Sequence, residues 1–208
     1  TCSDSLYSFF ILFQYFILSQ KNSSPSFQMN VLVTGTPGCG KTTLCQMLKD
    51  LLEETFSLSV QHLNISELVK QHNLHDGYDK RLDTFILDED KLLDYMETVL
   101  DFKSSSRNSF INLIDYHCTE IFPESWIDLV VVLTTDNTTL YDRLTQRNYS
   151  QLKISENVEC EIMQVVLTEA RESYKEEIIL VLDSTNKTDL ETNTEKVSQR
   201  IGKFLNRN

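Results

Sequence analysis

Asn30-Val-Leu-Val-Thr34 and Gly35-Thr-Pro-Gly-Cys-Gly-Lys-Thr42 are the two consecutive segments that decide the fold. The first is a short apolar run, which predicts a buried strand. The second fits the G-x-x-x-x-G-K-[ST] pattern of a phosphate-binding loop. Residues 41–54 then place leucines and a methionine at helical spacing, so the loop joins a strand to a helix, as this motif requires.

Glycine is concentrated in this loop, which holds three of the five glycines of the chain, Gly35, Gly38 and Gly40. Glycine lets backbone N–H groups turn inward and approach phosphate oxygens, and the N-terminus of the following helix adds positive potential. We therefore expect the loop to bind ATP, with Lys41 at the β and γ phosphates. The Thr42 hydroxyl is expected to ligate Mg²⁺, and Thr43 to lie on the α-phosphate side.

Beyond the loop, apolar strand patterns alternate with amphipathic helix patterns. Strands are expected near 58–63, 110–114, 129–133 and 178–182, and helices at 137–147, 156–174 and 190–205. Two more helices are expected to begin at Ser66, whose side chain can cap its own helix, and at Asp88. Five strands separated by helices predict an α/β fold, in which a five-stranded parallel sheet is covered by helices on both faces.

Asp115 closes the strand at 110–114, a position from which a carboxylate can hold the Mg²⁺ water shell beside Thr42. The alternative is an aspartate that only terminates a strand. His117 lies two residues further on, so it faces the same side if the chain stays extended. It could then orient a water or the metal shell, although a single histidine is more often structural.

Arg143 and Arg147 lie four residues apart on one expected helix, next to the polar segment 148–155. Two guanidinium groups on one helix face suit a triphosphate whose charge spreads during phosphoryl transfer. We assign them a catalytic role together with Lys41, Asp115 and His117. The alternative is a solvated helix face that pairs with neighbouring acidic side chains.

The composition indicates one soluble domain with an acidic surface. The chain has 208 residues, and its 19 Lys and Arg against 31 Asp and Glu give a net charge of −12. A surface this acidic disfavours sequence-specific nucleic-acid binding and leaves room for a basic protein partner or a small anionic ligand. The five cysteines form no C-x-x-C pair, which is typical of reduced thiols in the cytosol or nucleus.

Residues 1–28 differ from the rest of the chain. They contain a thirteen-residue apolar and aromatic run from Leu6 to Leu18, shorter than the roughly 18 residues needed to cross a bilayer. No basic segment precedes the run, as a signal peptide would require. We expect an extension that is disordered or arises from upstream translation, and no association with a membrane; a targeting or membrane-touching segment is the alternative. The folded domain is expected to span 29–208.

Several motifs together resemble the adenylate kinase isoenzyme 6 family. Besides the phosphate loop they are Asp76-Gly-Tyr-Asp79, Ile86-Leu-Asp-Glu-Asp90, Asp115-Tyr-His117, Phe122-Pro-Glu124, Arg143-Leu-Thr-Gln-Arg147, Cys160-Glu-Ile162 and Ser173-Tyr-Lys-Glu-Glu177. The resemblance covers residues from Met29 to about Leu205. It implies a nucleoside monophosphate kinase fold, adenylate kinase and ATPase activity, and a role in small-subunit rRNA processing. It also implies a basic small-subunit ribosomal protein as partner, and a location in nucleus and cytoplasm.

The same resemblance assigns residues to sites. It places a lid near 146–156 and a monophosphate-binding segment near 64–87, which would take AMP or another nucleoside monophosphate. Asp115 and His117 become the D-x-H motif, and Arg147 joins the loop in binding ATP. Two positions depart from the family, because Lys70 and Thr134 stand where members usually carry arginine. The residues expected at the monophosphate are Lys70, Gly77, Tyr78 and Asp79.

Two other functions fit parts of the sequence. Asn186-Lys-Thr-Asp189 matches the N-K-x-D pattern of a GTPase, but Asp115 is followed by Tyr-His-Cys rather than by the D-x-x-G switch. The second alternative is an ATP-driven assembly switch with negligible kinase activity, in which hydrolysis changes the grip on a partner. Comparing turnover of ATP, GTP and each monophosphate separates these functions from the kinase.

Overall fold

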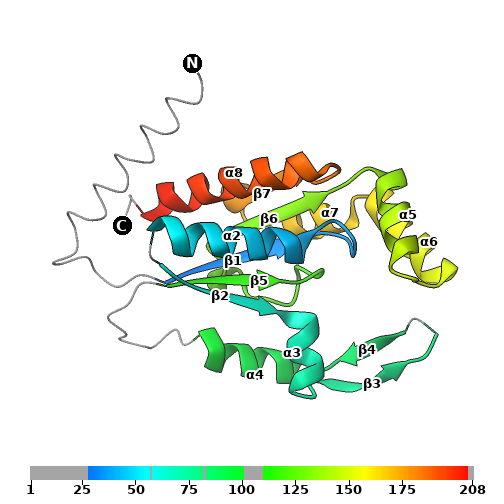
Figure 1. Cartoon of the computed structure of the whole chain (residues 1–208). Helices are drawn as coiled ribbons and strands as arrows, with labels where there is room; N and C mark the ends of the chain where they lie inside the picture. Colours follow the sequence, from blue (N-terminus) through cyan, green and yellow to red (C-terminus); the bar gives the residue numbers. More distant parts are fainter. Residues whose placement is uncertain (1–27, 57, 82, 101–109, 206–208) are drawn as a thin grey trace.

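The computed structural model describes residues 28–56, 58–81, 83–100 and 110–205. Its centre is a five-stranded sheet in the order β2-β5-β1-β6-β7, with all neighbouring strands parallel. This confirms the predicted five-stranded parallel sheet (Figure 1). The strands are β1 (Gln28–Thr34), β2 (Ser59–Asn64), β5 (Phe110–Asp115), β6 (Leu129–Thr134) and β7 (Ile179–Asp183).

Helices cover both faces of this sheet, because its central strands are apolar on both sides. Val31 and Val33 of β1 pack in one cluster with α2 (Lys41–Phe56) and α8 (Lys187–Leu205). Leu32, which points the opposite way, packs in a second cluster with helices on the other face. Those helices are α3 (Ile65–Gln71), α4 (Glu89–Leu100) and α7 (Val165–Ser173).

Two helices project from one end of the sheet (Figure 1). They are α5 (Asn137–Gln146) and α6 (Gln151–Ile162), and they share a small core of Leu140, Leu144 and Ile154. The single helix predicted at 156–174 is wrong. The chain breaks between α6 and α7 because Gln164 adopts a left-handed conformation, with φ at 51°, which an α-helix does not accommodate.

A second, two-stranded antiparallel sheet lies apart from the main one. It consists of β3 (His75–Asp79) and β4 (Thr84–Leu87), and the sequence patterns did not predict these strands. Its residues are mostly exposed or half-buried. The remaining elements are two short 3-10 helices, η1 (Glu124–Trp126) and η2 (Glu176–Ile178).

Two sequence predictions concern the chain boundaries. The prediction for residues 1–28 falls almost wholly outside the described residues. Gln28 belongs to β1, where it pairs with Phe110. The first strand therefore begins one residue before Met29, where the folded domain was expected to start. Within the described ranges no helix is long and apolar enough to span a membrane.

Candidate functional site: a phosphate loop at the carboxyl edge of the sheet

The phosphate loop turns tightly between β1 and α2. Gly35 and Gly38 have φ angles of 141° and 105°, which side chains on Cβ strongly disfavour. A Cβ at Gly35 would lie 2.4 Å from the Leu133 carbonyl oxygen, and one at Gly38 would lie 2.7 Å from Leu140. Glycine is therefore required here both by backbone conformation and by close packing on β6 and α5.

Lys41 opens α2 and lies across the loop. Its Nζ donates hydrogen bonds to the carbonyl oxygens of Gly35 at 2.6 Å and of Thr36 at 3.2 Å. Burial is the main cause that lowers the pKa of Lys41, and the charge of Arg147 lowers it further, whereas Asp115 raises it. The ammonium group thus lies beside the loop at the helix N-terminus, where negative phosphate oxygens are favoured.

Thr42 and Asp115 meet at the mouth of the loop. The Thr42 hydroxyl donates to Asp115 Oδ2 at 2.6 Å, and Asp115, at the end of β5, is only 3% exposed. A hydroxyl beside a carboxylate is the hard oxygen donor set that Mg²⁺ prefers, so these two residues fit the expected metal. Structure and sequence agree on their juxtaposition, which follows from the pairing of β1 with β5.

His117 follows Asp115 and keeps a neutral ring at physiological pH. Its ring packs on Tyr116, with centroids 4.5 Å apart. Part of the side chain is accessible to solvent, but the surrounding protein removes much of the water around the ring. This desolvation, together with the charge of Lys41, lowers the pKa of His117 to about 4, whereas the charge of Asp115 opposes the shift. A neutral imidazole can accept or donate one hydrogen bond to a water.

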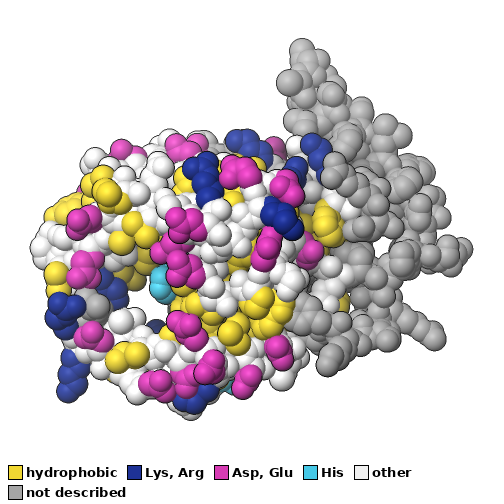
Figure 2. Space-filling model, turned by 180° about the vertical axis from the view of Figure 1, so that it is seen from behind, with side chains coloured by type: hydrophobic (Ala, Val, Ile, Leu, Met, Phe, Trp, Pro, Cys, Tyr) yellow, Lys and Arg dark blue, Asp and Glu magenta, His cyan; other side chains and the backbone are white. Residues whose placement is uncertain are grey.

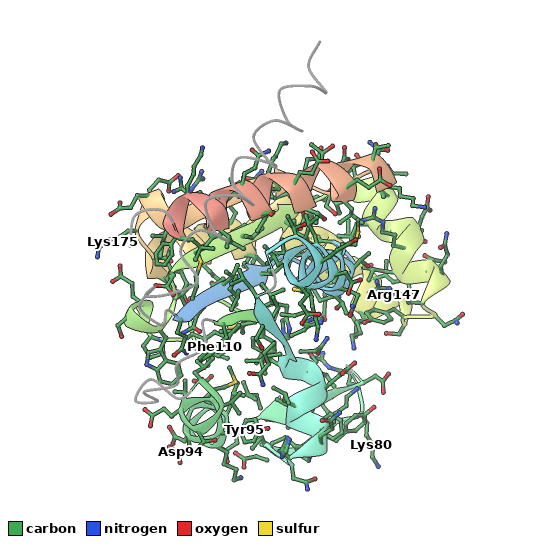
Figure 3. All side chains as sticks on the ribbon, turned by 60° about the vertical axis from the view of Figure 1, so that its left-hand side comes forward. Lys80, Asp94, Tyr95, Phe110, Arg147 and Lys175 are labelled. Atoms are coloured by element: carbon green, nitrogen blue, oxygen red, sulfur yellow. The ribbon has the colours of Figure 1, made fainter. Side chains whose placement is uncertain are left out.

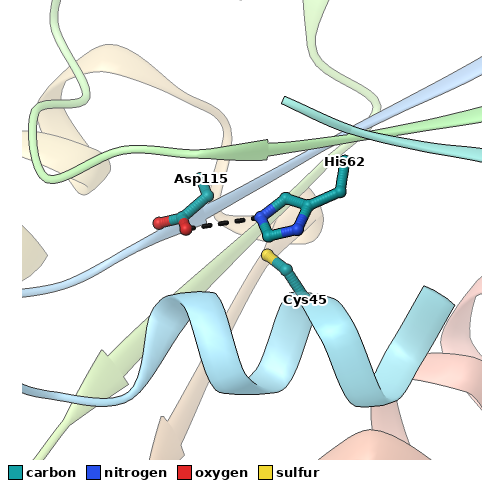
Figure 4. A group of neighbouring side chains, drawn as sticks. All are labelled: Cys45, His62 and Asp115. Carbon is teal, nitrogen blue, oxygen red and sulfur yellow. Dashed lines mark hydrogen bonds and ion pairs between the residues drawn. The ribbon is translucent and has the colours of Figure 1, made fainter. Parts of the chain in front are cut away.

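Two side chains of β2 also reach Asp115, and the sequence analysis did not identify either. His62 Nε2 lies 3.4 Å from Asp115 Oδ2 (Figure 4). Asn64 Nδ2 donates to the same oxygen at 3.0 Å. The side-chain oxygen Oδ1 of Asn64 accepts from the Glu67 N–H and caps α3, so the predicted cap at Ser66 is wrong. One amide side chain thereby fixes both a helix start and the Asp115 carboxylate.

The two arginines on α5 occupy different environments. Arg143 is half-buried and donates to the carbonyl oxygens of Ser184 at 3.0 Å and Thr185 at 2.9 Å, and to that of Gly38 at 3.3 Å. It ties the β7–α8 connection to the phosphate loop. Arg147, one turn later at the end of α5, is exposed. The helical spacing therefore places one arginine under the loop and the other at the open end of the site.

The expected lid and monophosphate segment approach each other at that end. Lys153 of α6 donates to the Asp83 carbonyl oxygen in the β3–β4 turn at 3.1 Å. Figure 3 shows Arg147 and Lys80, at the tip of the hairpin, on the same side of the molecule. Figure 2 shows the molecule hollowed at this end, with Lys and Arg side chains beside the hollow and acidic side chains over much of the face.

The residues expected at the monophosphate lie on or beside the hairpin. Lys70 lies in the last turn of α3, and its Nζ is 6.0 Å from the centre of the Phe85 ring. Gly77, Tyr78 and Asp79 belong to β3. The Tyr78 hydroxyl donates to the Asp83 carboxylate, and the Asp79 carboxylate accepts from the Arg81 N–H at 2.7 Å. Their contact with a nucleotide stays a prediction.

Glu161 of α6 is a further residue to which the sequence analysis gave no role, although it lies in the Cys160-Glu-Ile162 motif. Its carboxylate accepts hydrogen bonds from the Thr36 hydroxyl and, at 2.8 Å, from the Thr135 N–H. Burial raises the pKa of the adjoining Cys39 thiol to about 12, and the charge of Glu161 adds to this. The phosphate loop is thus held from the helix of the expected lid.

Asp189, the last residue of the N-K-x-D match, makes a structural contact in the first turn of α8. Its carboxylate accepts from the Asn186 N–H at 2.6 Å at the start of α8. In a helix capping box, a side chain three residues after the cap accepts a hydrogen bond from the backbone N–H of the cap residue, as Asp189 does here from Asn186. The motif is therefore accounted for by the start of the helix.

Comparisons with known proteins agree with this geometry. Residues 31–164 match a family model described as an AAA domain. The chain is 46% identical over 179 residues to the adenylate kinase isoenzyme 6 homolog of Dictyostelium discoideum, covering 86% of this chain and 95% of that protein. It is 43% identical over 176 residues to the adenylate kinase isoenzyme 6 homolog HBR1 of Candida albicans, covering 83% of this chain and 68% of that protein.

A solved structure shows the same fold at low sequence identity. The shikimate kinase of Bacteroides thetaiotaomicron has a TM-score of 0.53 at 12% identity, covering 83% of this chain and 98% of that chain. A phosphate loop on this fold, together with these relatives, indicates a nucleotide kinase-like enzyme that binds ATP. The chain belongs to the adenylate kinase isoenzyme 6 family.

Proposed function

We propose that the protein is an adenylate kinase, which transfers the γ-phosphoryl group of ATP to AMP, and that it hydrolyses ATP slowly when AMP is absent. The observation that carries the proposal is the 2.6 Å hydrogen bond from Thr42 to Asp115 at the mouth of the glycine loop. It brings together two oxygens that suit Mg²⁺, beside Lys41, where the β and γ phosphates of ATP would lie.

The chemistry needs positioning more than proton transfer. The phosphate of AMP carries no proton that must be removed before its oxygen attacks, so the protein has to align two anions, neutralise them and exclude water. Bound through Thr42 and Asp115, Mg²⁺ would supply neutralising charge. Lys41 would exchange its carbonyl partners for phosphate oxygens, and Arg147 would reach the transferred group from the open end of the site.

Hydrolysis needs no separate machinery. When a water takes the place of AMP, the same site can transfer the phosphoryl group to it. His117 is neutral and lies two residues after Asp115, so it could hold such a water. An assembly switch with negligible kinase activity is the second candidate, and the observation in its favour is Lys70, which offers the monophosphate a single ammonium instead of a bidentate guanidinium.

The cellular role belongs to the same proposal. The family resemblance supports action in small-subunit rRNA processing, in nucleus and cytoplasm, with a basic ribosomal protein as partner. The net charge of −12 suits such a partner electrostatically. Binding between this chain and a basic small-subunit protein is expected to weaken as salt rises, and affinity that does not change with salt would contradict this pairing.

One assay tests the enzymatic part. ADP formation by the full chain is measured with ATP or GTP, alone and with each nucleoside monophosphate. The kinase predicts that AMP accelerates turnover of ATP at least about tenfold above the basal rate. No acceleration by any monophosphate supports the assembly switch, and faster turnover of GTP than of ATP would support the GTPase.

Variants at Lys70 sharpen the assay. Lys70→Arg restores the bidentate fork and is expected to lower the KM for AMP, whereas Lys70→Met is expected to raise it. Lys196→Met, which removes an exposed ammonium on α8 outside this segment, is the matched control and should leave that KM unchanged. Equal effects of Lys70→Met and Lys196→Met would remove Lys70 from the monophosphate site.

A further inference from the structure

Three side chains with different ligand atoms converge beneath the phosphate loop (Figure 4). Cys45 lies on α2, one turn after Thr42, while His62 comes from β2 and Asp115 from β5. A thiol, an imidazole nitrogen and a carboxylate oxygen thereby lie within 4.8 Å of one another. Neither Cys45 nor His62 belongs to the phosphate-loop motif, and the proposed kinase chemistry uses neither of them.

The spacing suits a tetrahedral ion. With metal–ligand bonds of roughly 2.0–2.3 Å, tetrahedral ligand atoms stand roughly 3.3–3.8 Å apart. His62 Nε2 and Asp115 Oδ2 are 3.4 Å apart, which already meets this requirement. The Cys45 sulfur lies within 4.8 Å of both, so a side-chain movement of about 1 Å completes the triangle.

The cluster is protected on one side and open on the other. Cys45 is fully buried and Asp115 is 3% exposed, while the His62 side chain is 15% exposed. A cavity of about 330 Å³ adjoins it, and Thr42, His62 and Asn64 are among its lining residues. An ion can enter from this cavity, and a water from it can take the fourth ligand position.

The donor set distinguishes between cations. Mg²⁺ takes oxygen ligands in an octahedral arrangement, whereas a thiolate with an imidazole and one carboxylate suits Zn²⁺. Asp115 is the residue that both sites share. We propose that Cys45, His62 and Asp115 form an inhibitory Zn²⁺ site, which withdraws Asp115 from the Mg²⁺ shell; this inhibition, but not the binding, rests on the proposed function.

Binding of Zn²⁺ at this site exchanges the thiol proton of Cys45 for the metal ion. A sulfur–metal bond replaces the S–H bond of Cys45, and the thiol proton leaves to solvent. His62 binds through Nε2 as the neutral ring, and the Asp115 carboxylate is oriented by Asn64, which donates to the same oxygen at 3.0 Å. The structural alternative is that Cys45 only fills the core and His62 only orients Asp115.

Binding is tested on the full chain without nucleotide, by competition between the protein and a chromogenic Zn²⁺ chelator. The cluster predicts one Zn²⁺ per chain, with an affinity that falls at least about tenfold in Cys45→Ser and in His62→Phe. Cys160→Ser, a half-buried thiol on α6, is the matched control and should bind as the wild type does. Equal affinity of the wild type and both cluster variants would overturn the proposal.

Co²⁺ gives a second readout that does not depend on affinity. A thiolate-to-cobalt charge-transfer absorption is expected in the wild type and in Cys160→Ser, and it should be absent in Cys45→Ser. His62→Phe should keep this absorption at saturating Co²⁺, because the thiolate remains. An absorption that persists in Cys45→Ser would assign the metal to another thiol and overturn the proposal.

Inhibition is tested separately, so that the two proposals can fail independently. At saturating Mg²⁺ and ATP, Zn²⁺ is expected to inhibit turnover of the wild type, while Cys45→Ser turns over ATP but is at least about tenfold less sensitive to Zn²⁺. Equal inhibition of both would overturn the inhibitory site. A chain that binds Zn²⁺ through Cys45 but turns over no ATP would contradict the proposed function and leave the metal site supported.

Discussion

Two polar clusters in the described part of the chain share strand β5, and they differ in what surrounds them. The carboxyl-edge cluster, which comprises Thr42, His62, Asn64 and Asp115, borders a cavity and the phosphate loop. The mid-strand cluster comprises Asn30 of β1, Asn112 of β5 and Asp128, which directly precedes β6; both asparagines are buried in the sheet. There, Asn112 donates to Asn30 at 2.7 Å, and the Asn30 N–H donates to Asp128 at 2.8 Å.

This difference separates binding from support. In the mid-strand cluster most donors and acceptors bond to other groups of the fold. The side-chain Nδ2 of Asn30, for example, donates to the Trp126 carbonyl oxygen at 2.8 Å. At the carboxyl edge, several groups converge on one oxygen of Asp115 beside open space. Buried polar residues therefore indicate a ligand site only where they converge next to a cavity and a source of charge.

The largest expected effect comes from removing the functional groups of the carboxyl edge. Asp115→Ala combined with His117→Ala is expected to lower ATP turnover at least about 100-fold, because it removes the proposed Mg²⁺ ligand and the ring proposed to hold the water. Turnover is measured at saturating ATP and Mg²⁺. Unchanged turnover would remove both residues from the proposed mechanism.

Gly35→Ala tests the loop through stability. The added Cβ would meet the Leu133 carbonyl oxygen at 2.4 Å, and the φ of 141° is strained for alanine. We expect a loss of about 2–4 kcal/mol in the free energy of unfolding, measured with urea. A change below about 0.5 kcal/mol would mean that the loop relaxes freely, contrary to the tight packing described for it.

Asn112→Ala tests the mid-strand cluster, where we expect a loss of stability and no loss of turnover. It removes a donor to Asn30 inside the sheet, so unfolding is expected to cost about 1–3 kcal/mol less. Turnover per folded molecule should stay within about twofold of the wild type, because the site is left intact. A large loss of turnover without loss of stability would erase the distinction between the two clusters.

Asp128 gives the smallest effect, and the size of this effect depends on pH. Burial raises the pKa of its carboxyl group, so between the unfolded value of 3.8 and the folded value the native state binds more protons than the unfolded state. Stability therefore falls as pH rises through this window, and the penalty is complete above the folded pKa.

Asp128→Asn removes the charge and keeps an oxygen that accepts from the Asn30 N–H. The variant is expected to be slightly more stable than the wild type at pH 7, and the difference should shrink towards pH 4 in urea unfolding curves recorded at both values. A variant that is less stable at pH 7 would show that the charged hydrogen bond outweighs the burial of the carboxylate.

How much the sequence predicts depends on whether a feature is local. The phosphate loop is local, because Gly35 to Thr42 are contiguous and flanked by clear patterns, and its geometry matches the motif. Asp115 was also predicted beside Thr42, since the ends of parallel strands meet at one edge of a sheet. The hairpin β3–β4 was not predicted, because β3 mixes two aspartates with Gly77 and β4 is only four residues long.

Features that depend on strand order could not be predicted. His62 and Asn64 reach Asp115 only because β2 lies next to β5, and no pattern within β2 specifies that neighbour. The break at Gln164 was missed because apolar residues continue at helical spacing on both sides of it. Arg143 and Arg147 share a helix face, but packing places only Arg143 against the β7–α8 connection.

Calorimetry of ATP binding decides whether the glycine loop is a nucleotide site, with ATP and Mg²⁺ titrated into the full chain and into Lys41→Met. We expect one ATP per wild-type chain and at least about tenfold weaker binding to Lys41→Met, because the variant loses the ammonium that would face the β and γ phosphates. Equal affinity of the two proteins, or no binding to the wild type, would contradict this expectation.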